Sequence, residues 1–316
     1  MRRRRNLILG AAEALSWPEL EPFVVSLGET SFSGDVVIFA ADLDREATSE
    51  LTQAGIDLRP MRRLRLPARG GIQPYDLRLA RFHAAYSRVI RSLSRLARDR
   101  ALTTARLAAA ISVRDVRRFL LYYRYLSARQ DSYRYVMLTD VRDVVFQSDP
   151  FDSELGDELL CFLEDERQPI ARQPHNRKWV QTAFGPDVLR ELGALPVVCA
   201  GVTIGPSHRV LGYLRVMIEF LSSLPTQRTG LDQAVHNYVI HKGLVPDVRL
   251  VSNGSPLVAT LGTVPPEDVG RYQGTAVLHQ YDRHPALAAT LIRRYRRSAE
   301  ATATKSAARP PSVAGS

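Results

Sequence analysis

Short apolar runs alternate with amphipathic segments over the first sixty residues, and this alternation restricts the fold more than any other feature. The runs have the length of buried strands, and the segments between them have helical spacing. We expect strands at residues 6–11, 36–39 and 56–59 and helices at residues 17–27 and 45–54. Ser16 is a suitable N-cap for the first helix, with Pro18 in its first turn, and Gly55 is suited to end the second. A strand–helix–strand–helix–strand order predicts a parallel sheet.

Later segments extend this pattern. We expect helices at residues 115–128, 210–221 and 231–241 and strands at residues 135–139, 197–204 and 275–278. Residues 1–298 are therefore predicted to form one α/β domain, with a Rossmann-like, mostly parallel central sheet flanked by helices. Residues 299–316 are rich in Ala, Ser, Thr and Pro, and they are predicted to be a disordered tail.

Residues 62–112 interrupt the alternation with an Arg- and Ala-rich insertion that holds little β-forming sequence. Apolar side chains recur in it at helical spacing, at Leu79, Phe82, Tyr86, Val89, Ile90 and Leu93. We expect one long amphipathic helix followed by a looser segment. Covering the core is the expected use of the apolar stripe, and docking to a partner or to a membrane surface are the alternatives.

The formal net charge of the 316-residue chain is +10, and only three of its basic residues are lysines. Such a charge attracts nucleotide phosphates, anionic lipid headgroups or nucleic acid, although a basic surface that is merely solvated is the simpler interpretation. The arginines are spread along the chain and no nucleic-acid-binding module is recognisable, so we expect no nucleic-acid partner. We expect a cytoplasmic protein, and peripheral contact of its basic surface with the inner face of the membrane is an alternative to a surface that is merely solvated.

The N-terminus and the cysteines agree with a cytoplasmic protein. Arg2–Arg5 before a short apolar run imitates a secretory signal, but Glu13 interrupts the run, and a buried first strand is the better interpretation. No run of about 18 apolar residues occurs, so no transmembrane helix is expected. Cys161 and Cys199 are the only cysteines, and they have neither a metal-ligand spacing nor the number needed for a disulfide framework.

Two carboxylates directly follow the strand predicted at residues 135–139. Asp140 and Asp143 would lie at the carboxyl end of a parallel strand, which is where α/β sheets bind ligands. Their hard oxygen atoms suit Mg²⁺ or Mn²⁺, and either ion can bridge a diphosphate. The alternative is structural: Asp140 caps a turn and Asp143 pairs with Arg142 or another arginine.

This stretch resembles the metal-binding segment of GT-A glycosyltransferases, in which a hydrophobic strand runs into Asp-x-Asp. Residues 146–151 continue the segment much as those families do. Here the two carboxylates are three residues apart instead of two, so it stays open whether both Asp140 and Asp143 ligate the metal. Asp143 precedes an apolar run, as the second family aspartate does.

Residues 197–205 are similar to the Asn-(Ser/Ala)-Gly segment of glycogenin-like and bacterial galactosyltransferase families. The resemblance implies that Ala200 and Gly201 lie against the donor sugar, since small residues allow close approach of the backbone. Cys199 stands where an Asn is usual, and a thiol cannot replace the hydrogen bonds of an amide. A small buried hydrophobe is the alternative interpretation of Cys199.

Residues 229–238 are similar to the Asp-Gln segment of the same families. The resemblance implies that Asp232 and Gln233 are catalytic residues that face the donor sugar and the reaction centre. In the alternative, Asp232 is the N-cap of the following helix, which leaves Gln233 unexplained.

Three further residues are assigned by the same resemblance. His279 follows the late apolar strand, and the family places there a histidine that completes the metal site with the two aspartates; His284 is the weaker alternative. Arg118, before the metal strand, corresponds to a basic residue that contacts the donor. Ala11, at the end of the first strand, is assigned to substrate binding together with Arg118.

The resemblance covers residues 6–295 in the expected order. It implies a metal-dependent, hexosyltransferase-like enzyme that moves a sugar from a nucleotide-sugar donor, such as a UDP- or GDP-sugar, to an acceptor that the sequence does not identify. By analogy the enzyme would retain the anomeric configuration. The alternatives are a catalytically silent GT-A-like binding protein and a basic nucleic-acid-binding protein. A sugar-nucleotide pyrophosphorylase is rejected because residues 10–14 lack its Gly-rich, Arg-containing loop.

Overall fold

The computed structural model describes residues 4–62, 77–224 and 228–296, with side chains described from residue 85 onward in the second range. The predicted tail at 299–316 and the side chains of Leu79 and Phe82 therefore lie outside the described residues.

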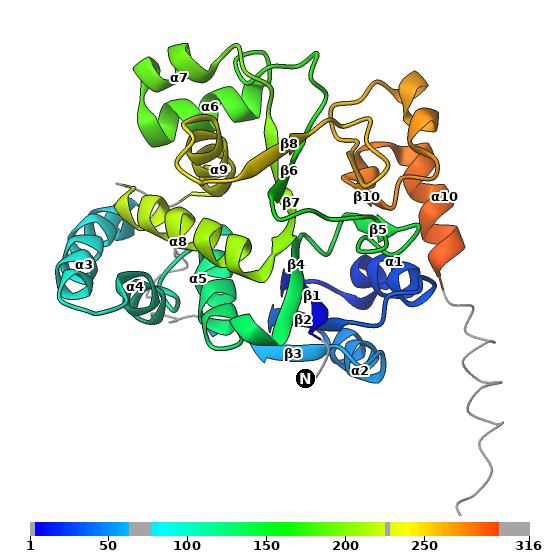
Figure 1. Cartoon of the computed structure of the whole chain (residues 1–316), viewed down its shortest axis with the longest axis horizontal. Coiled ribbons are helices and arrows are strands. Elements are labelled where there is room, and N and C mark those ends of the chain that lie inside the picture. The colour runs from blue at the N-terminus through cyan, green and yellow to red at the C-terminus, as the bar shows by residue number, and fades with distance from the viewer. Residues whose placement is uncertain (1–3, 63–76, 225–227, 297–316) are drawn as a thin grey trace, which may run out of the picture.

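A seven-stranded sheet forms the centre of the molecule, in the order β3-β2-β1-β4-β7-β6-β8 (Figure 1). Its strands are β1 (Arg5–Glu13), β2 (Asp35–Ala41), β3 (Asp57–Pro60), β4 (Tyr133–Thr139), β6 (Leu159–Leu163), β7 (Val198–Pro206) and β8 (Val248–Val251). β7 runs antiparallel to its neighbours β4 and β6, and every other neighbouring pair in this sheet is parallel. The predicted α/β class with a mostly parallel central sheet is confirmed.

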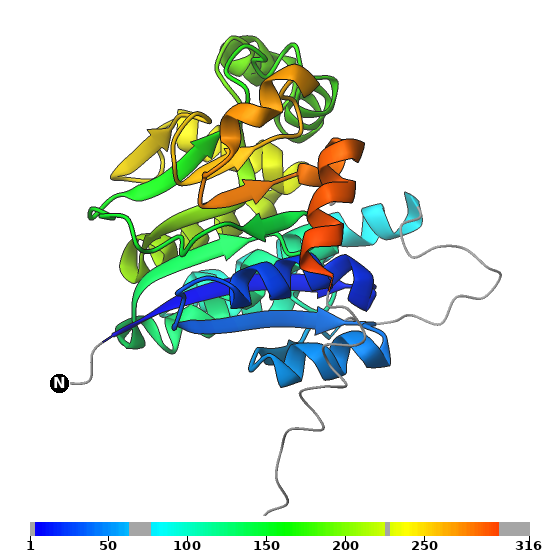
Figure 2. The ribbon, with the colours of Figure 1, turned by 90° about the vertical axis from the view of Figure 1, so that its right-hand side faces the viewer.

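Helices cover both faces of the sheet because the sheet strands carry apolar side chains on both faces. Leu7 and Leu9 of β1 belong to the hydrophobic core on one face, whereas Ile8 belongs to the core on the other face. The first face is covered by α4 (Arg100–Ala108), α5 (Arg114–Ser127), α8 (Ser207–Ser223) and α9 (Leu231–His241). The second is covered by α1 (Trp17–Gly28) and α2 (Arg45–Gln53), and Figure 2 looks onto this face.

The start of the chain agrees closely with the predicted elements. Ser16 precedes α1 and forms a capping box with Glu19, which accepts hydrogen bonds from the Ser16 backbone and hydroxyl. α2 ends before Gly55, whose φ of +77° suits a residue without a Cβ atom. The local signals alone therefore located these two helices.

A second, three-stranded sheet lies beside the carboxyl end of β4, in the order β5-β10-β9. Its strands are β5 (Val144–Phe146), β9 (Val258–Thr260) and β10 (Val277–His279). β10 is antiparallel to β5, and His279 is in register with Val144. This pairing joins the segment after β4 to a strand that follows about 130 residues later in the sequence.

The remaining elements lie at the ends of the molecule. α6 (Pro174–Phe184) and α7 (Pro186–Leu192) pack beside α9, and α10 (Pro285–Tyr295) packs on the small sheet and α1 (Figure 1). The 3₁₀ helices are η1 (Gln130–Ser132), η2 (Pro266–Tyr272) and η3 (Tyr281–Arg283). Among the described residues, no helix has the length and apolar character needed to cross a membrane.

The insertion differs from its prediction in two respects. α3 (Leu77–Arg95) is the expected amphipathic helix, but the segment after it is a second helix, α4, whose N-cap Asp99 accepts a hydrogen bond from the Leu102 backbone at 2.9 Å. The apolar stripe was expected to cover the core. Ile90 is buried, but Val89 and Leu93 are more than half exposed, so for these two residues that expectation is wrong.

Candidate metal centre

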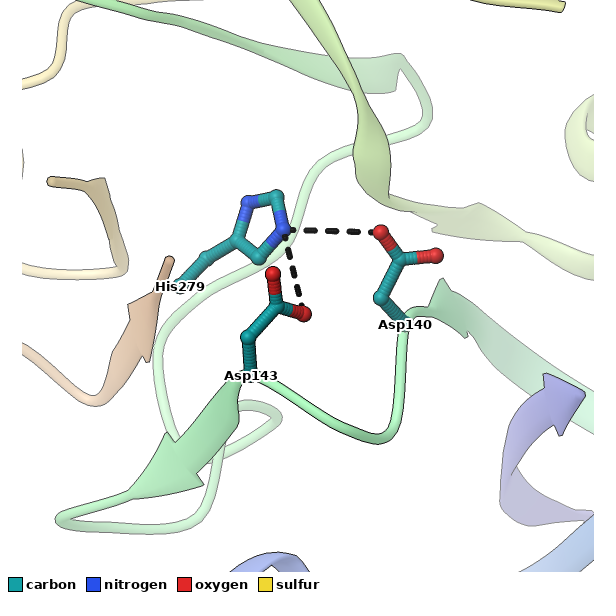
Figure 3. Close-up of side chains that lie close together, drawn as sticks. All are labelled: Asp140, Asp143 and His279. Atoms are coloured by element: carbon teal, nitrogen blue, oxygen red, sulfur yellow. Dashed lines mark ion pairs between the residues drawn. The ribbon is translucent and has the colours of Figure 1, made fainter. Parts of the chain in front are cut away.

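Three side chains that could hold a metal ion converge from separate strands (Figure 3). Asp140 follows β4, Asp143 precedes β5, and His279 is the last residue of β10. The Nε2 atom of His279 lies 3.5 Å from Oδ2 of Asp140 and 3.8 Å from Oδ1 of Asp143. One potential ligand atom from each residue lies within 4.8 Å of the others. The structure therefore brings together the three predicted metal ligands.

The turn between the two aspartates absorbs the additional residue. Its middle side chain, Val141, is buried against Gly10 of β1, so closely that a Cβ atom on Gly10 would overlap it. The backbone N–H of Asp140 donates to Gly201 at 2.8 Å, and the carbonyl of Asp143 accepts from Gln280 at 2.8 Å. Both ends of the turn are thus fixed, one by each sheet.

The imidazole of His279 is oriented by two neighbours on its other nitrogen. Nδ1 lies 3.4 Å from the thiol of Cys199 and 3.5 Å from the hydroxyl of Thr260, while the buried Nε2 has no hydrogen-bond partner. The thiol and the hydroxyl can each donate to Nδ1 or accept from it, so they hold the ring while Nε2 faces the two carboxylates. A ring held through one nitrogen, with the other directed at carboxylates, is typical of a metal-ligating histidine.

The geometry of the three groups fits a small divalent cation. An octahedral ion with ligands at about 2.1 Å separates its ligand atoms by about 3 to 4 Å, which is close to the distances found here. Two carboxylates favour Mg²⁺ or Mn²⁺, and the imidazole favours the softer Mn²⁺ of the two. Among the described residues Nε2 of His279 makes no hydrogen bond, and it faces both carboxylates at ion-pair distance, so the three groups can ligate one ion.

Arg118 links this centre to α9. Its guanidinium, on α5, donates to Oδ1 of Asp140 and, at 2.7 Å, to Oδ2 of Asp232. Asp140 therefore uses one oxygen for Arg118 and directs the other toward His279. The alternative that Asp232 is an N-cap is wrong: Gly230 occupies the N-cap position with a φ of +84°, and Asp232 lies within the first turn of α9.

The local electrostatics shift the pKa values of the three buried carboxyl groups in different directions. Burial raises the pKa of Asp140, but the positive charges of Arg118 and His279 outweigh it and hold that pKa well below its usual range. Burial raises the pKa of Asp143. Burial also raises the pKa of Asp232 to about 6, against the opposing charge of Arg118. Buried carboxylates are stabilised by a positive charge between them, and a divalent cation supplies such a charge when bound.

The two small residues of β7 lie beside the metal ligands. A Cβ atom on Gly201 would lie 2.6 Å from Nε2 of His279 and 2.9 Å from Oδ2 of Asp140, so only glycine leaves room for both ligands. The backbone N–H of Ala200 donates to the side-chain oxygen of Gln233 at 2.8 Å, and the amide of Gln233 donates to Val198 at 2.7 Å. Both ends of the Gln233 amide are thus engaged with the backbone of β7.

Ala11 lies at the same edge of the sheet. It follows Gly10, which pairs with Thr139 at the carboxyl end of β4, and its side chain is partly exposed. The assignment of Ala11, Ala200 and Gly201 to substrate binding stays a prediction.

The structural alternatives for the aspartates and for the histidine do not agree with the contacts. Arg142 pairs with Asp282 at 2.9 Å, and the only ion-pair contact found for the Asp143 carboxylate among the described residues is with His279. His284 hydrogen-bonds the carbonyl of Leu261 at 2.8 Å and lies outside the cluster of potential ligands. Asp143 is therefore not an arginine partner, and His284 has a structural contact instead.

Sequence reasoning missed three residues around the centre. Cys199 was considered only as a replacement for Asn or a buried hydrophobe, and Thr260 carried no signal, because it follows an apolar run of only three residues. Glu164 follows β6 and is buried beside Gln173, and burial raises the pKa of its carboxyl. The rule that located Asp140, a carboxylate directly after an apolar run, would also have located Glu164.

Known proteins share little sequence with this chain. No protein-family model matches it, and no curated protein matches it. Among solved structures, the chain is similar to WbbM, described as a bifunctional glycosyltransferase in its apo form, with a TM-score of 0.47 and 10% sequence identity. The similarity covers 87% of this chain and 45% of the WbbM chain, so this chain spans less than half of that chain's length.

Proposed function

We propose that this chain is a metal-dependent glycosyltransferase of the GT-A type, which transfers a hexose-like sugar from a nucleoside-diphosphate sugar to an acceptor hydroxyl. The observation that carries the proposal is the group of Asp140, Asp143 and His279 at the carboxyl edge of the central sheet. Such a group suits a donor with a diphosphate, because the diphosphate oxygens complete the coordination of the same ion.

In the proposed reaction the bond between the anomeric carbon and the diphosphate breaks, and a bond between that carbon and the acceptor oxygen forms. The diphosphate leaves with the bonding electron pair and takes up the proton that the acceptor hydroxyl loses. When bound, the ion would neutralise charge on the leaving diphosphate. Asp140, Asp143 and His279 would hold that ion, and the UDP or GDP portion would extend toward Ala11.

Asp232 and Arg118 would act on the sugar side of the site. Arg118 holds the carboxylates of Asp140 and Asp232 at one guanidinium, so the sugar-facing group keeps a fixed position relative to the metal ligands. Asp232 would stabilise positive charge developing at the anomeric carbon, with retention of configuration as the expected outcome. Gln233 would act as a positioning residue that fixes Ala200 and Gly201 beside the sugar.

The first experiment measures binding and transfer with and without metal. Thermal unfolding of the full chain is followed with a panel of UDP- and GDP-sugars, each with Mn²⁺, with Mg²⁺ and with EDTA. We expect one donor to raise the melting temperature only with metal, since a ligand at about 100 times its dissociation constant stabilises the native state by about 2.7 kcal/mol. EDTA should abolish hydrolysis of that donor, and Mn²⁺ should restore it.

The outcomes distinguish the enzyme from its alternatives. Binding of a donor without hydrolysis or transfer to any acceptor would favour a catalytically silent binding protein. Full turnover in EDTA would contradict the metal-dependent mechanism. The cytoplasmic location and the absence of a nucleic-acid partner stay predictions, which fractionation of cells and a filter-binding assay can check.

A further inference from the structure

The insertion carries an apolar surface that faces away from the rest of the molecule. α3 lies at the outer edge, separated from the central sheet by α5 and α8 (Figure 1). Val89 and Leu93 are 56% and 53% exposed, and Leu96, directly after the helix, is 88% exposed. These are the most exposed large apolar side chains among the described residues.

The exposed apolar side chains form one stripe. Val89, Leu93 and Leu96 are four and three residues apart, the spacing of one face of a helix. The buried face of α3 is different and consists of Ser87, Ile90 and Ser94 in the described part. Because α3 packs through its buried face, the apolar stripe is not needed for folding.

Strong positive charge accompanies the stripe. Residues 85–108 contain no lysine, six arginines and one acidic residue. The acidic residue is Asp99, which caps α4 and contacts the hydroxyl of Tyr123. Among the described residues, Arg95, Arg98 and Arg100 make no hydrogen bond or ion pair, so their charges are available to an external anion.

A groove extends this basic surface toward α8. It has a volume of about 720 Å³, and its lining includes five arginines, three serines and two acidic residues: Arg91, Arg95, Arg98, Arg100, Arg215, Ser94, Ser222, Ser223, Asp99 and Glu219. Arg95 is exposed and also lines the groove, so the groove adjoins the outer surface of α3. Arginines and hydroxyl groups together are suited to phosphate.

We propose that the surface formed by residues 85–108 binds an anionic phospholipid membrane. The apolar stripe enters the boundary of the bilayer, and the arginines contact lipid phosphates. A second copy of this chain is a poorer occupant, because a two-fold contact through this surface would bring the same arginines together. A nucleic acid would use the arginines but not the apolar stripe. The inference does not depend on the proposed catalytic function.

The experiment is sedimentation of the full chain with vesicles. Vesicles of phosphatidylcholine alone are compared with vesicles in which about one third of the lipid is phosphatidylglycerol. Leu93→Ser with Leu96→Ser removes apolar contacts, and Arg95→Glu with Arg98→Glu reverses charge. We expect each pair to weaken binding to the anionic vesicles at least tenfold, and we expect the wild type to bind neutral vesicles much more weakly.

Matched pairs elsewhere control for general effects on charge and hydrophobicity. Leu244→Ser with Leu250→Ser changes two other exposed leucines, and Arg172→Glu with Arg177→Glu changes two other exposed arginines. The affinity of these two control variants for anionic vesicles should lie within about twofold of the wild-type affinity. The reason is that a charge is attracted to the membrane only when it lies within about a Debye length of the surface. Circular dichroism confirms that each variant is folded.

Three results would overturn the proposal. The first is equal binding of the Leu93 and Leu96 variant and the wild type. The second is a dimer, seen by light scattering, that dissociates in the Leu93→Ser, Leu96→Ser variant and also in the Arg95→Glu, Arg98→Glu variant. The third is binding of an oligonucleotide that the arginine changes abolish and the leucine changes leave intact, which would assign the surface to nucleic acid.

Discussion

Single side chains in the proposed metal centre combine two constraints, since each proposed ligand must reach the ion and must also remain folded beside the other ligands. Asp143 shows this combination most clearly. It is buried with a carboxylate and an imidazole close by, and burial raises its pKa. Without a bound cation its charge is a cost to the fold, whereas with a cation it is a ligand.

Asp143→Asn should therefore lower the affinity for Mn²⁺ without lowering the stability of the metal-free fold. Without metal we expect a melting temperature equal to or above that of the wild type, because a neutral amide of the same size replaces an unfavourable buried charge. We expect Mn²⁺ affinity to fall and turnover to drop by about 10²-fold, as for loss of one preorganised electrostatic contact. Calorimetric titration with Mn²⁺ measures the affinity. Asp282→Asn is the control. An unchanged Mn²⁺ affinity of the Asp143→Asn variant would show that Asp143 is not a metal ligand.

Gly201→Ala tests the close approach of β7 to the ligands. The added Cβ atom overlaps the positions of His279 and Asp140, so the ligands must move apart. We expect a loss of Mn²⁺ binding and a destabilisation of about 1–3 kcal/mol, typical of overpacking. Gly212→Ala in α8 is the matched control, because a Cβ atom there meets nothing within 4 Å and alanine favours a helix. Normal Mn²⁺ affinity of Gly201→Ala in a calorimetric titration would show that the ligand positions described here are not those of the metal-bound protein.

Among whole elements, the contact between α9 and β7 determines the shape of the proposed sugar side of the site. Gln233 bonds the backbone of Val198 and Ala200, and Asn237, one turn later, bonds both backbone groups of Val198. Two amide side chains thus hold the start of β7 against one face of α9. The strand segment that carries Ala200 and Gly201 depends on this contact for its position.

Gln233→Ala should reduce transfer by one to three orders of magnitude while the affinity for the free nucleoside diphosphate stays nearly unchanged. The reason is that the diphosphate contacts lie at the metal ligands, whereas Gln233 positions the sugar side. Asn237→Ala is the matched variant, because it should cost a similar 1–3 kcal/mol of stability through unpaired backbone groups. Chemical denaturation and steady-state kinetics provide the two measurements. If Gln233→Ala and Asn237→Ala lost turnover to the same extent, the role of Gln233 would be purely structural.

For the whole molecule, acid stability should depend on a buried histidine between α8 and α9. His236 is fully buried, its Nδ1 lies 2.7 Å from the Tyr213 hydroxyl, and burial lowers its pKa to about 3. The unfolded chain binds a proton at His236 near pH 6.5, whereas the folded chain does so only near pH 3. The native state therefore loses stability as the pH falls from about 6.5 to about 3, by up to about 1.4 kcal/mol per pH unit.

His236→Gln should flatten this part of the stability profile. Glutamine retains a hydrogen-bonding group toward Tyr213 but does not titrate, so the difference between the variant and the wild type isolates the contribution of His236. Urea denaturation at pH 7, 6, 5 and 4 measures the free energy of unfolding. Parallel profiles for His236→Gln and the wild type would contradict the assigned pKa.

The sequence by itself determined the elements whose signals are local. The alternation of apolar runs and helical segments was sufficient for β1, α1, β2, α2 and β3, because caps, glycines and periodicity act within a few residues. The carboxylates after β4 were also visible, since a parallel sheet collects ligands at its carboxyl edge. The short strands β5, β6, β8 and β9 were missed because three to five residues hold too little periodicity. The helices α6, α7 and α10 were missed because each buries only one or two side chains and so carries a weak apolar stripe.

Only the tertiary structure decided how the site is assembled. The pairing of β10 with β5 brings His279 to Asp143, and the guanidinium of Arg118 joins Asp140 to Asp232. Both depend on contacts between residues more than one hundred positions apart, and no local pattern specifies such contacts. The same reason explains why the stripe of α3 was expected to cover the core: periodicity shows that a helix has an apolar face, but only packing shows whether another element covers it.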